Sequence, residues 1–189
     1  MYAYLLFVVL LASGIQAQVP FIGKCPEVKV QQNFDINRYL GTWIEVEKYF
    51  SVAEVGRKCA ESVYTSTDNG TTTLLHIQMT GIITKLPFTL DAHVVHTGKP
   101  GEAKLENHYT FPIHFVAPYW VLETDYDSYA VVWSCTQLIG MNTQFAWILT
   151  RDRNYPQELL DKAHDVFDRN NLSRRVLHKG DQTNCPKYN

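Results

Sequence analysis

The chain has 189 residues, and its 17 lysine and arginine residues are set against 19 aspartate and glutamate residues, which leaves a formal net charge of −2 at pH 7. No excess or cluster of basic side chains indicates binding to nucleic acid or to an anionic membrane surface. The length suits one domain with a sizeable core, and no internal repeat, low-complexity segment or linker indicates a second.

The N-terminal segment, residues 1–17, has the composition of a secretory leader. It contains no Asp, Glu, Lys or Arg, and Leu5–Ala12 is a continuous apolar run. This run is too short to span a bilayer, which takes about 20 apolar residues, and the small residue Ala17 suits a cleavage site. The sequence therefore predicts a signal peptide at 1–17, a single mature domain at 18–189, and a secreted, extracellular protein.

The cysteines and the sequons fit that compartment. An even number of cysteines in a secreted chain favours disulfides, although the sequence alone allows three ways of pairing the four residues. Because no two of them form a Cys-x-x-Cys pair, a zinc site is not predicted. Asn69-Gly-Thr and Asn171-Leu-Ser are sequons, so both asparagines are predicted to carry N-glycans. The cysteines are Cys25, Cys59, Cys135 and Cys185.

Residues 33–50 predict a short helical turn that runs directly into a strand. Asp35 can cap the turn by accepting hydrogen bonds from the next backbone amides, and Gly41 lets the backbone change direction. From Trp43 onward the residues alternate between two faces, neither of which is purely polar. Mixed faces indicate a strand that is covered on both sides, as in a closed barrel with a filled lumen. The face shared with Trp43 holds Glu45, Glu47 and Tyr49.

Between residues 58 and 150 the sequence repeats strand and turn signals. Asn69-Gly70 between alternating residues is a strong hairpin signal, and no helical period intervenes, which excludes parallel βαβ units. Eight short strands joined mainly by hairpins predict an all-β fold, an eight-stranded antiparallel up-and-down β-barrel. The strands after the first are predicted at 62–67, 71–79, 88–94, 103–111, 119–125, 129–136 and 145–150.

One α-helix is predicted near the C-terminus. Pro156 suits its first turn, and Asn170-Asn171 provides its stop. Between them an apolar stripe recurs at three- and four-residue spacing, which indicates that the helix packs on the outside of the barrel. The stripe consists of Leu159, Leu160, Ala163, Val166 and Phe167.

Three separated pieces of the sequence resemble the lipocalin motifs, in the right order. Gly41-Thr-Trp43 opens the first strand, Thr124-Asp125-Tyr126 lies in a strand–turn–strand context, and Arg151 follows the last strand. Further segments are similar to lipocalins of the apolipoprotein D, Lazarillo and bilin-binding type. These segments are Gly23–Pro26, Ala117–Trp120, Thr124–Tyr129, Phe145–Leu149 and Asn184–Lys187.

This resemblance implies a carrier that binds a small hydrophobic molecule in the barrel lumen, such as a fatty acid, sterol, retinoid, hydrocarbon or bilin. It also implies the disulfides Cys25–Cys135 and Cys59–Cys185, which leave no cysteine free as a catalytic thiol, so an enzyme is not expected. Arg151 should stack on Trp43 at the closed end of the barrel, where its donors can satisfy backbone carbonyls of the helical turn.

Strand phase nominates the side chains that line the lumen, most of which are apolar or aromatic, as in a typical ligand pocket. For the aromatic residues ordinary core packing is an equal alternative, and for Glu47 the alternative is a solvated carboxylate at the rim. If Glu47 faces the cavity, desolvation should raise its pKa, so that fatty acids bind more strongly as the pH falls. The predicted ligand-binding residues are Glu47, Tyr49, Leu75, Ile77, Met79, Leu90, Tyr119, Val121, Phe145 and Trp147.

The histidines do not form the pattern of a metal site. His93 and His96 lie on opposite faces of a strand because their separation is odd, and no histidine pair has ligand spacing together with a supporting carboxylate. Neither a metal ion nor haem is predicted, and the expected bound group is the hydrophobic ligand itself, with a bilin among the candidates.

The segment Phe111–Trp120 is apolar and contains two prolines that should prevent ladder pairing, so it is predicted to be a loop. An exposed apolar loop at a barrel mouth marks either a ligand entrance or a surface for a partner. The alternative to a carrier is therefore a protein that contacts a lipid particle, a membrane or a receptor through this loop. The loop could equally fold over the barrel as a lid.

Overall fold

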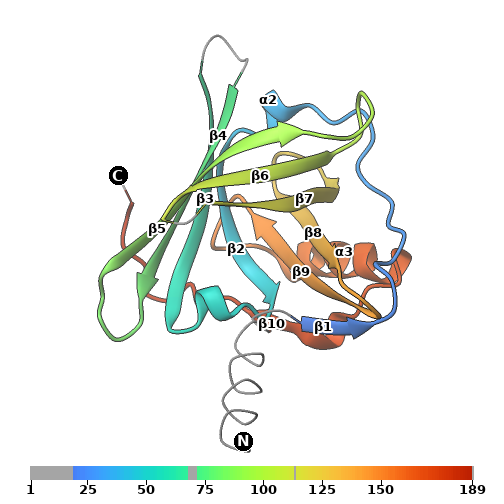
Figure 1. Ribbon diagram of the computed structural model, residues 1–189. Helices are drawn as coiled ribbons and strands as arrows, with labels where there is room; N and C mark the ends of the chain where they lie inside the picture. The colour runs from blue at the N-terminus through green and yellow to red at the C-terminus, as the bar shows by residue number, and fades with distance from the viewer. Residues whose placement is uncertain (1–18, 68–71, 113, 189) are drawn as a thin grey trace, which may run out of the picture.

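The computed structural model describes residues 19–67, 72–112 and 114–188. Its central feature is a closed barrel of eight antiparallel strands in which each strand pairs with the next and β9 pairs back to β2 (Figure 1). This is the predicted architecture. The predicted signal peptide and Asn69 lie outside the described residues. The strands are β2 (Gly41–Tyr49), β3 (Arg57–Thr67), β4 (Thr72–Gly81), β5 (Pro87–His96), β6 (Lys104–Phe111), β7 (Phe115–Thr124), β8 (Tyr129–Gln137) and β9 (Met141–Thr150).

Two short strands extend the barrel wall. β1 (Val19–Ile22) pairs with the first half of β9, and β10 (Leu177–Lys179) pairs with the end of β2. The sequence did not predict them, because strands of four and three residues carry too little alternation to be recognised apart from their partners.

A helical turn, α2 (Ile36–Tyr39), precedes β2 and closes the end of the barrel at which β2 begins. It lies in the upper part of Figure 1. As predicted, Asp35 caps the turn, and its carboxylate accepts a hydrogen bond of 2.9 Å from the amide of Asn37. Gly41 follows with φ +94°, and a Cβ atom there would lie 3.3 Å from Nη1 of Arg151. Only glycine adopts that backbone geometry without strain and also leaves room for the guanidinium.

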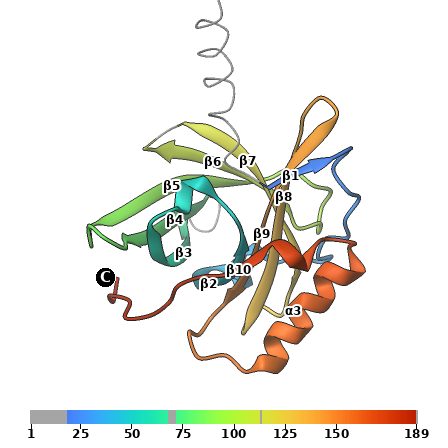
Figure 2. The same ribbon diagram turned by 90° about the horizontal axis from the view of Figure 1, so that it is seen from below.

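The helix α3 (Gln157–Arg169) lies against the outside of the wall beside β8 and β9 (Figure 2). It begins directly after Pro156 and ends at Asn170, as predicted. The buried side chains of its apolar stripe form one core with outward-facing residues of the barrel, among them Val46 and Val131. A second core fills the closed end inside the barrel, around Tyr39 and Trp43. The two cores lie on opposite sides of β2.

The C-terminal segment after β10 fills the space between β2 and β3. The amide of Gly180 donates to the carbonyl of Val46 at 2.9 Å, and the amide of Cys59 donates to the carbonyl of Asp181 at 2.8 Å. The Gln182 side chain donates to the carbonyls of Glu45 (2.8 Å) and Ala60 (3.1 Å). Residues 177–182, which we call the C-terminal strap, therefore complete the wall where β2 and β3 have separated.

Both disulfides have the pairing that the resemblance implies. Cys25–Cys135 joins the segment after β1 to β8, and Cys59–Cys185 joins β3 to the chain just beyond the C-terminal strap. They span 110 and 126 residues of sequence. Each one fastens a terminal segment to the barrel wall.

The prediction of a loop over Phe111–Trp120 is wrong for most of its length. β6 continues to Phe111 and β7 begins at Phe115, so that Pro118 lies within a strand, opposite Glu106. Pairing of β7 with β8 begins at Trp120, and a proline that precedes this ladder removes no hydrogen bond from it. Pro118 therefore marks a strand with one open edge, whereas Pro112 lies in the short connection between β6 and β7.

Candidate functional site

A cavity of about 130 Å³ occupies the barrel lumen. Its wall is mostly apolar, and the rings of Phe145 and Trp147 stack in it with centroids 5.6 Å apart. Because typical pockets for drug-sized ligands have about 300–1,000 Å³, this volume favours a slender ligand. Of the predicted lining residues, the cavity wall contains Leu75, Ile77, Met79, Leu90, Tyr119, Phe145 and Trp147.

The prediction that Glu47 and Tyr49 face the lumen is wrong. The register of β2 against β9 shifts between Glu45 and Glu47, and such a bulge reverses the side-chain phase of the residues that follow it. Glu45 still lines the cavity, but Glu47 contacts Nε2 of His164 on α3 at 2.7 Å. The Tyr49 ring lies 6.0 Å from that of Phe167. The predicted pH dependence that rested on Glu47 therefore has no structural basis.

Val121 is also absent from the cavity wall in the described residues, although it has the inward phase. It is fully buried in the core at the closed end, below the cavity. Its role there is packing, an alternative that the sequence analysis had left open only for the aromatic residues.

A cluster of tyrosines forms the floor of the cavity. The hydroxyls of Tyr39 and Tyr119 are hydrogen-bonded at 3.0 Å, and the ring centroid of Tyr64 lies 5.2 Å from that of Tyr39 and 6.1 Å from that of Tyr119. Burial raises the pKa of all three hydroxyls well above the usual value. The floor is therefore polar but uncharged at any physiological pH.

Asn107 of β6 is a polar residue of the cavity wall that the sequence analysis missed. Its side chain is only 1% exposed, and its amide oxygen has no hydrogen-bond partner among the described residues. The alternation of Leu105, Asn107 and Tyr109 along β6 was a usable signal, because all three have the inward phase.

A buried group of three charged side chains lies beside the mouth of the cavity. Lys48 Nζ lies 2.6 Å from Glu45 Oε1 and also forms an ion pair with Glu54. Glu54 belongs to the one-turn helix η2 (Val52–Glu54) in the β2–β3 connection. Burial, reinforced by the charge of Glu54 and opposed by Lys48, raises the pKa of Glu45 to about 8. Burial lowers the pKa of Lys48, but the two carboxylates outweigh it and raise that pKa overall.

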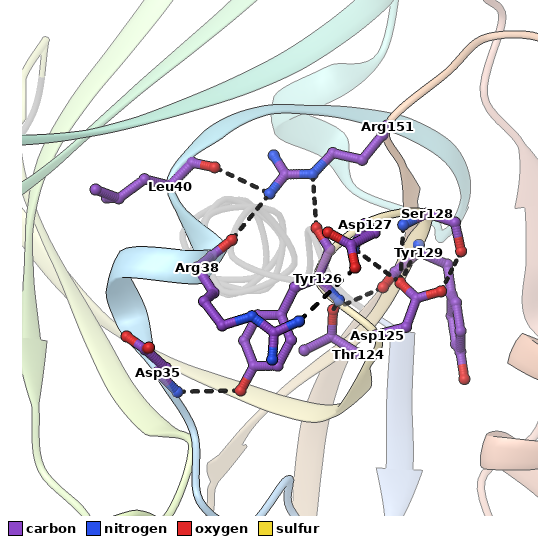
Figure 3. Close-up of polar contacts among 10 residues, drawn as sticks. All are labelled: Asp35, Arg38, Leu40, Thr124, Asp125, Tyr126, Asp127, Ser128, Tyr129 and Arg151. Atoms are coloured by element: carbon purple, nitrogen blue, oxygen red, sulfur yellow. Dashed lines mark hydrogen bonds and ion pairs between the residues drawn. The ribbon is translucent and has the colours of Figure 1, made fainter.

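Arg151 lies at the closed end of the barrel, between Leu40 and Tyr126 (Figure 3). Its guanidinium carbon lies 3.7 Å from the ring centroid of Trp43. Its nitrogens donate to the carbonyls of Thr42 (2.8 Å), Leu40 (2.9 Å) and Tyr126 (3.0 Å). The cation and the ring are therefore fixed against the backbone, and both close the barrel without lining the cavity.

The turn that follows β7 has the same structural character (Figure 3). The Asp125 carboxylate accepts hydrogen bonds from the amides of Asp127, Ser128 and Tyr129, at 3.1, 2.8 and 3.0 Å. Although burial acts in the opposite direction, the Ser128 hydroxyl and these amides lower the pKa of Asp125. The Tyr126 hydroxyl accepts from the amide of Asp35 at 3.0 Å, which ties this turn to α2. Thr124 completes the motif by donating to the carbonyl of Tyr129 at 2.7 Å.

Exposed apolar side chains gather at the open end. Val55 follows η2, while Ile82, Ile83 and Leu86 belong to the β4–β5 connection. The amide of Ile82 donates to the carbonyl of Gly56 at 2.8 Å, so the two connections are neighbours. Val55, Ile83 and Leu86 are 60%, 91% and 66% exposed. We call Val55, Ile82, Ile83 and Leu86 the mouth patch.

The described part of the chain contains neither a cluster of metal ligands nor a membrane-spanning helix. No group of three or more His, Cys, Asp or Glu side chains there is arranged to hold a metal ion. None of the helices in the same residues has the length and apolar character needed to cross a membrane.

A closed antiparallel barrel with an apolar lumen, one outer helix and an arginine–tryptophan contact at its floor defines the lipocalin class of folds. The chain belongs to the Lipocalin / cytosolic fatty-acid binding protein family, which it matches over residues 40–184. It is 36% identical to apolipoprotein D of Cavia porcellus over 181 residues, which cover 94% of this chain and 93% of that protein. It is 29% identical to the Lazarillo protein of Schistocerca americana over 166 residues, which cover 84% of this chain and 75% of that protein.

Solved structures share the fold. Insecticyanin from the tobacco hornworm Manduca sexta superposes with a TM-score of 0.79 at 20% identity, covering 88% of this chain and 90% of that one. Apocrustacyanin C2 superposes with a TM-score of 0.75 at 24% identity, covering 88% of this chain and 93% of that one.

Proposed function

We propose that this protein is an extracellular carrier that binds one slender hydrophobic molecule in the barrel lumen. The observation that carries the proposal is the apolar cavity, closed below by the tyrosine floor and bounded by Ile77, Leu90 and Trp147. Family membership and the similarity to apolipoprotein D support it. Transfer of apolar ligand surface out of water into such a cavity supplies the binding free energy, at about 25 cal/mol per Å² before the costs of association.

A variant that fills the cavity tests this proposal. Ala117 lines the lumen, whereas Val116, the preceding residue of β7, is exposed. Ala117→Phe should weaken binding of a fluorescent alkyl-chain probe at least about tenfold, because the added ring occupies the space of the ligand. Val116→Phe, the matched control, should leave the affinity unchanged. Equal affinities of the two variants for the probe would show that the ligand does not bind in the lumen.

The proposed role involves no catalysis. All four cysteines are paired in disulfides, which leaves no thiol as a nucleophile, and the buried tyrosines remain protonated because their pKa values are raised. The proposal therefore accounts for the site by binding alone. Recovery of a ligand in unchanged form after incubation with the protein, followed by mass spectrometry, is the expected result.

An extracellular protein is made through the secretory pathway, and three further proposals follow from that. They are cleavage of the signal peptide after Ala17, a mature domain of residues 18–189, and N-glycans on Asn69 and Asn171. The two disulfides support an oxidising compartment. Asn171 lies just after α3 and is exposed, so its side chain is accessible for N-glycosylation. Intact-mass analysis of the secreted protein before and after glycosidase treatment tests the cleavage site and both glycans.

A second candidate function is contact with a lipid surface, for which the mouth patch is the supporting observation. Ile83 and Leu86 present large apolar side chains to solvent, and exposed apolar patches commonly mark interaction sites. Phe111 and Phe115, from the segment first predicted as a loop, add exposed rings at the same end. Ile83→Asp with Leu86→Asp should abolish flotation with neutral phospholipid vesicles, while Ala117→Phe should leave flotation intact. If both variants still float with the vesicles, contact with a lipid surface through the mouth patch is rejected.

A further inference from the structure

The charges around the lumen distinguish between possible ligands. Glu45 and Glu54 both line the cavity, and its wall in the described residues contains no lysine, arginine or histidine. Lys48, the cation that neutralises these carboxylates, contacts both of them and borders an adjoining cavity beneath the C-terminal strap, which shares Glu45 and Glu54 with the lumen. A ligand carboxylate in the lumen would therefore find no unpaired cation in the cavity wall, and burial of an unpaired charge is costly.

The side chain of Asn107 places a second requirement on the chemistry of the ligand. Its amide oxygen is buried in the cavity wall and accepts no hydrogen bond among the described residues. Burial raises the pKa of the neighbouring Tyr109 hydroxyl, and the Asn107 side chain, by donating to it, opposes that rise. A buried acceptor without a donor is destabilising, whereas a ligand that supplies an O–H or N–H group satisfies it. Asn107 lies about halfway along β6, between Leu105 in the closed-end core and Tyr109 nearer the mouth. A group bound there lies inside the barrel, and the rest of the ligand extends toward the open end.

We infer that the lumen selects an uncharged, slender lipid that carries a hydroxyl group or another hydrogen-bond donor, and that Asn107 accepts this hydrogen bond. This inference rests on the proposed carrier function and specifies its ligand class. Long-chain alcohols and other hydroxylated neutral lipids fit, and free fatty-acid anions do not. The alkyl chain then contacts Ile77, Met79 and Leu90 on the way to the mouth.

Three ligands with the same chain separate these requirements: 1-decanol, decyl methyl ether and decanoate, titrated into the wild-type protein at pH 7.5 by isothermal calorimetry. The alcohol should bind most tightly. The ether accepts but does not donate, so it should bind about 3–10-fold more weakly, the usual effect of one net hydrogen bond. Decanoate should bind at least about tenfold more weakly, because its charge enters a poorly hydrated, mostly apolar site that offers no cation.

A substitution assigns the preference to Asn107. Asn107→Leu should reduce the affinity for decanol to that for the ether and leave the affinity for the ether unchanged. Glu106→Leu, the matched control, alters the neighbouring residue of β6 whose side chain contacts His108 outside the barrel, and it should preserve the preference for decanol. Circular dichroism of each variant monitors the fold, and the wild-type ranking is decisive even if Asn107→Leu does not fold.

The possible results are distinguishable. Equal wild-type affinities for decanol and the ether, or tightest binding of decanoate, would overturn the ligand class while leaving the carrier function standing. An intact preference for decanol in folded Asn107→Leu would overturn the assignment to Asn107. If none of the three ligands binds to the wild-type protein, the proposed carrier function and this inference both fail.

Discussion

The two ends of the barrel differ in whether their polar and apolar side chains have favourable partners. At the closed end, Arg151 donates to backbone carbonyls of α2 and of the β7–β8 turn while stacking on Trp43. At the open end, apolar side chains such as Ile83 face solvent, and charges such as Glu45 are buried beside the cavity. Stability is therefore concentrated where no ligand passes, and groups that are costly in a folded protein are concentrated where a ligand enters.

The largest expected effect is at the closed end. Arg151→Ala should lower the free energy of unfolding by about 3–4 kcal/mol, because carbonyls of the helical turn lose a charged donor and Trp43 loses its stacked cation. Arg174→Ala, outside the barrel, removes an ion pair with Asp168 in which both side chains are about half exposed, and it should cost less than about 1 kcal/mol. Urea denaturation of both variants measures the difference. Equal losses would show that the closed end is not the main source of stability.

The disulfide that fastens the C-terminal strap should have the next largest effect. The double substitution Cys59→Ser with Cys185→Ser should destabilise the protein by about 2–4 kcal/mol, mainly through the greater freedom of the unfolded chain. Hydrogen exchange should also accelerate at the Gly180 amide, which bonds to Val46 beside the opening between β2 and β3. Unchanged exchange there would show that backbone hydrogen bonds alone hold the strap.

The buried charges at the mouth predict a pH dependence of stability. The pKa of Glu45 is raised to about 8 in the folded protein, so between about pH 4.5 and 8 the folded state binds more protons than the unfolded state, and stability decreases as the pH rises. Glu45→Gln carries no such proton. It should stabilise the protein at pH 8 by roughly 1–3 kcal/mol, since one pKa unit corresponds to about 1.4 kcal/mol, and have little effect at pH 4.

Thermal unfolding of the wild type and Glu45→Gln across this range provides the measurement. Glu47→Gln is the matched control, because Glu47 lies outside the lumen against His164. If Glu45→Gln has the same pH profile as the wild type, the carboxylate of Glu45 does not titrate as its surroundings indicate.

The smallest effect is expected in the mouth patch. Ile83→Ser should change the free energy of unfolding by no more than about 0.5 kcal/mol, because a side chain that is 91% exposed loses almost no packing on truncation. Leu75→Ala on the adjacent β4, where Leu75 is 1% exposed, should cost about 2–5 kcal/mol. Chemical denaturation compares the two. A large loss in Ile83→Ser would mean that the mouth patch contributes to the core.

Local signals predicted much of this fold. The cap at Asp35, the helix between Pro156 and Asn170, and the inward phase of Leu75, Ile77 and Met79 follow from the sequence because each depends on neighbouring residues. The disulfide pairing came from the resemblance to lipocalins, since spacing alone left three arrangements open.

The errors share one physical cause: they depend on strand pairing between distant residues. The β2 bulge after Glu45 exists only in register with β9, and it reversed the predicted directions of Glu47 and Tyr49. Pro118 is accommodated because pairing with β8 begins beyond it. The alternation of side chains along a single strand predicts neither the bulge in β2 nor the point at which pairing with β8 begins. Asn107 was different, because the alternation along β6 did indicate its direction.

The C-terminal strap has a consequence for biosynthesis. Its Gly180 and Gln182 bond to Val46 and Glu45 of β2, the first strand of the barrel to leave the ribosome. Gln182 follows Glu45 by 137 residues, so the strap is made much later. While the chain is still being translated, β2 and β3 therefore present unpaired backbone groups along their separated halves, a typical condition for aggregation. The wall is complete only once the strap has been made, so deletion of residues 177–182 should lower the secretion yield more strongly than their distance from the cavity suggests.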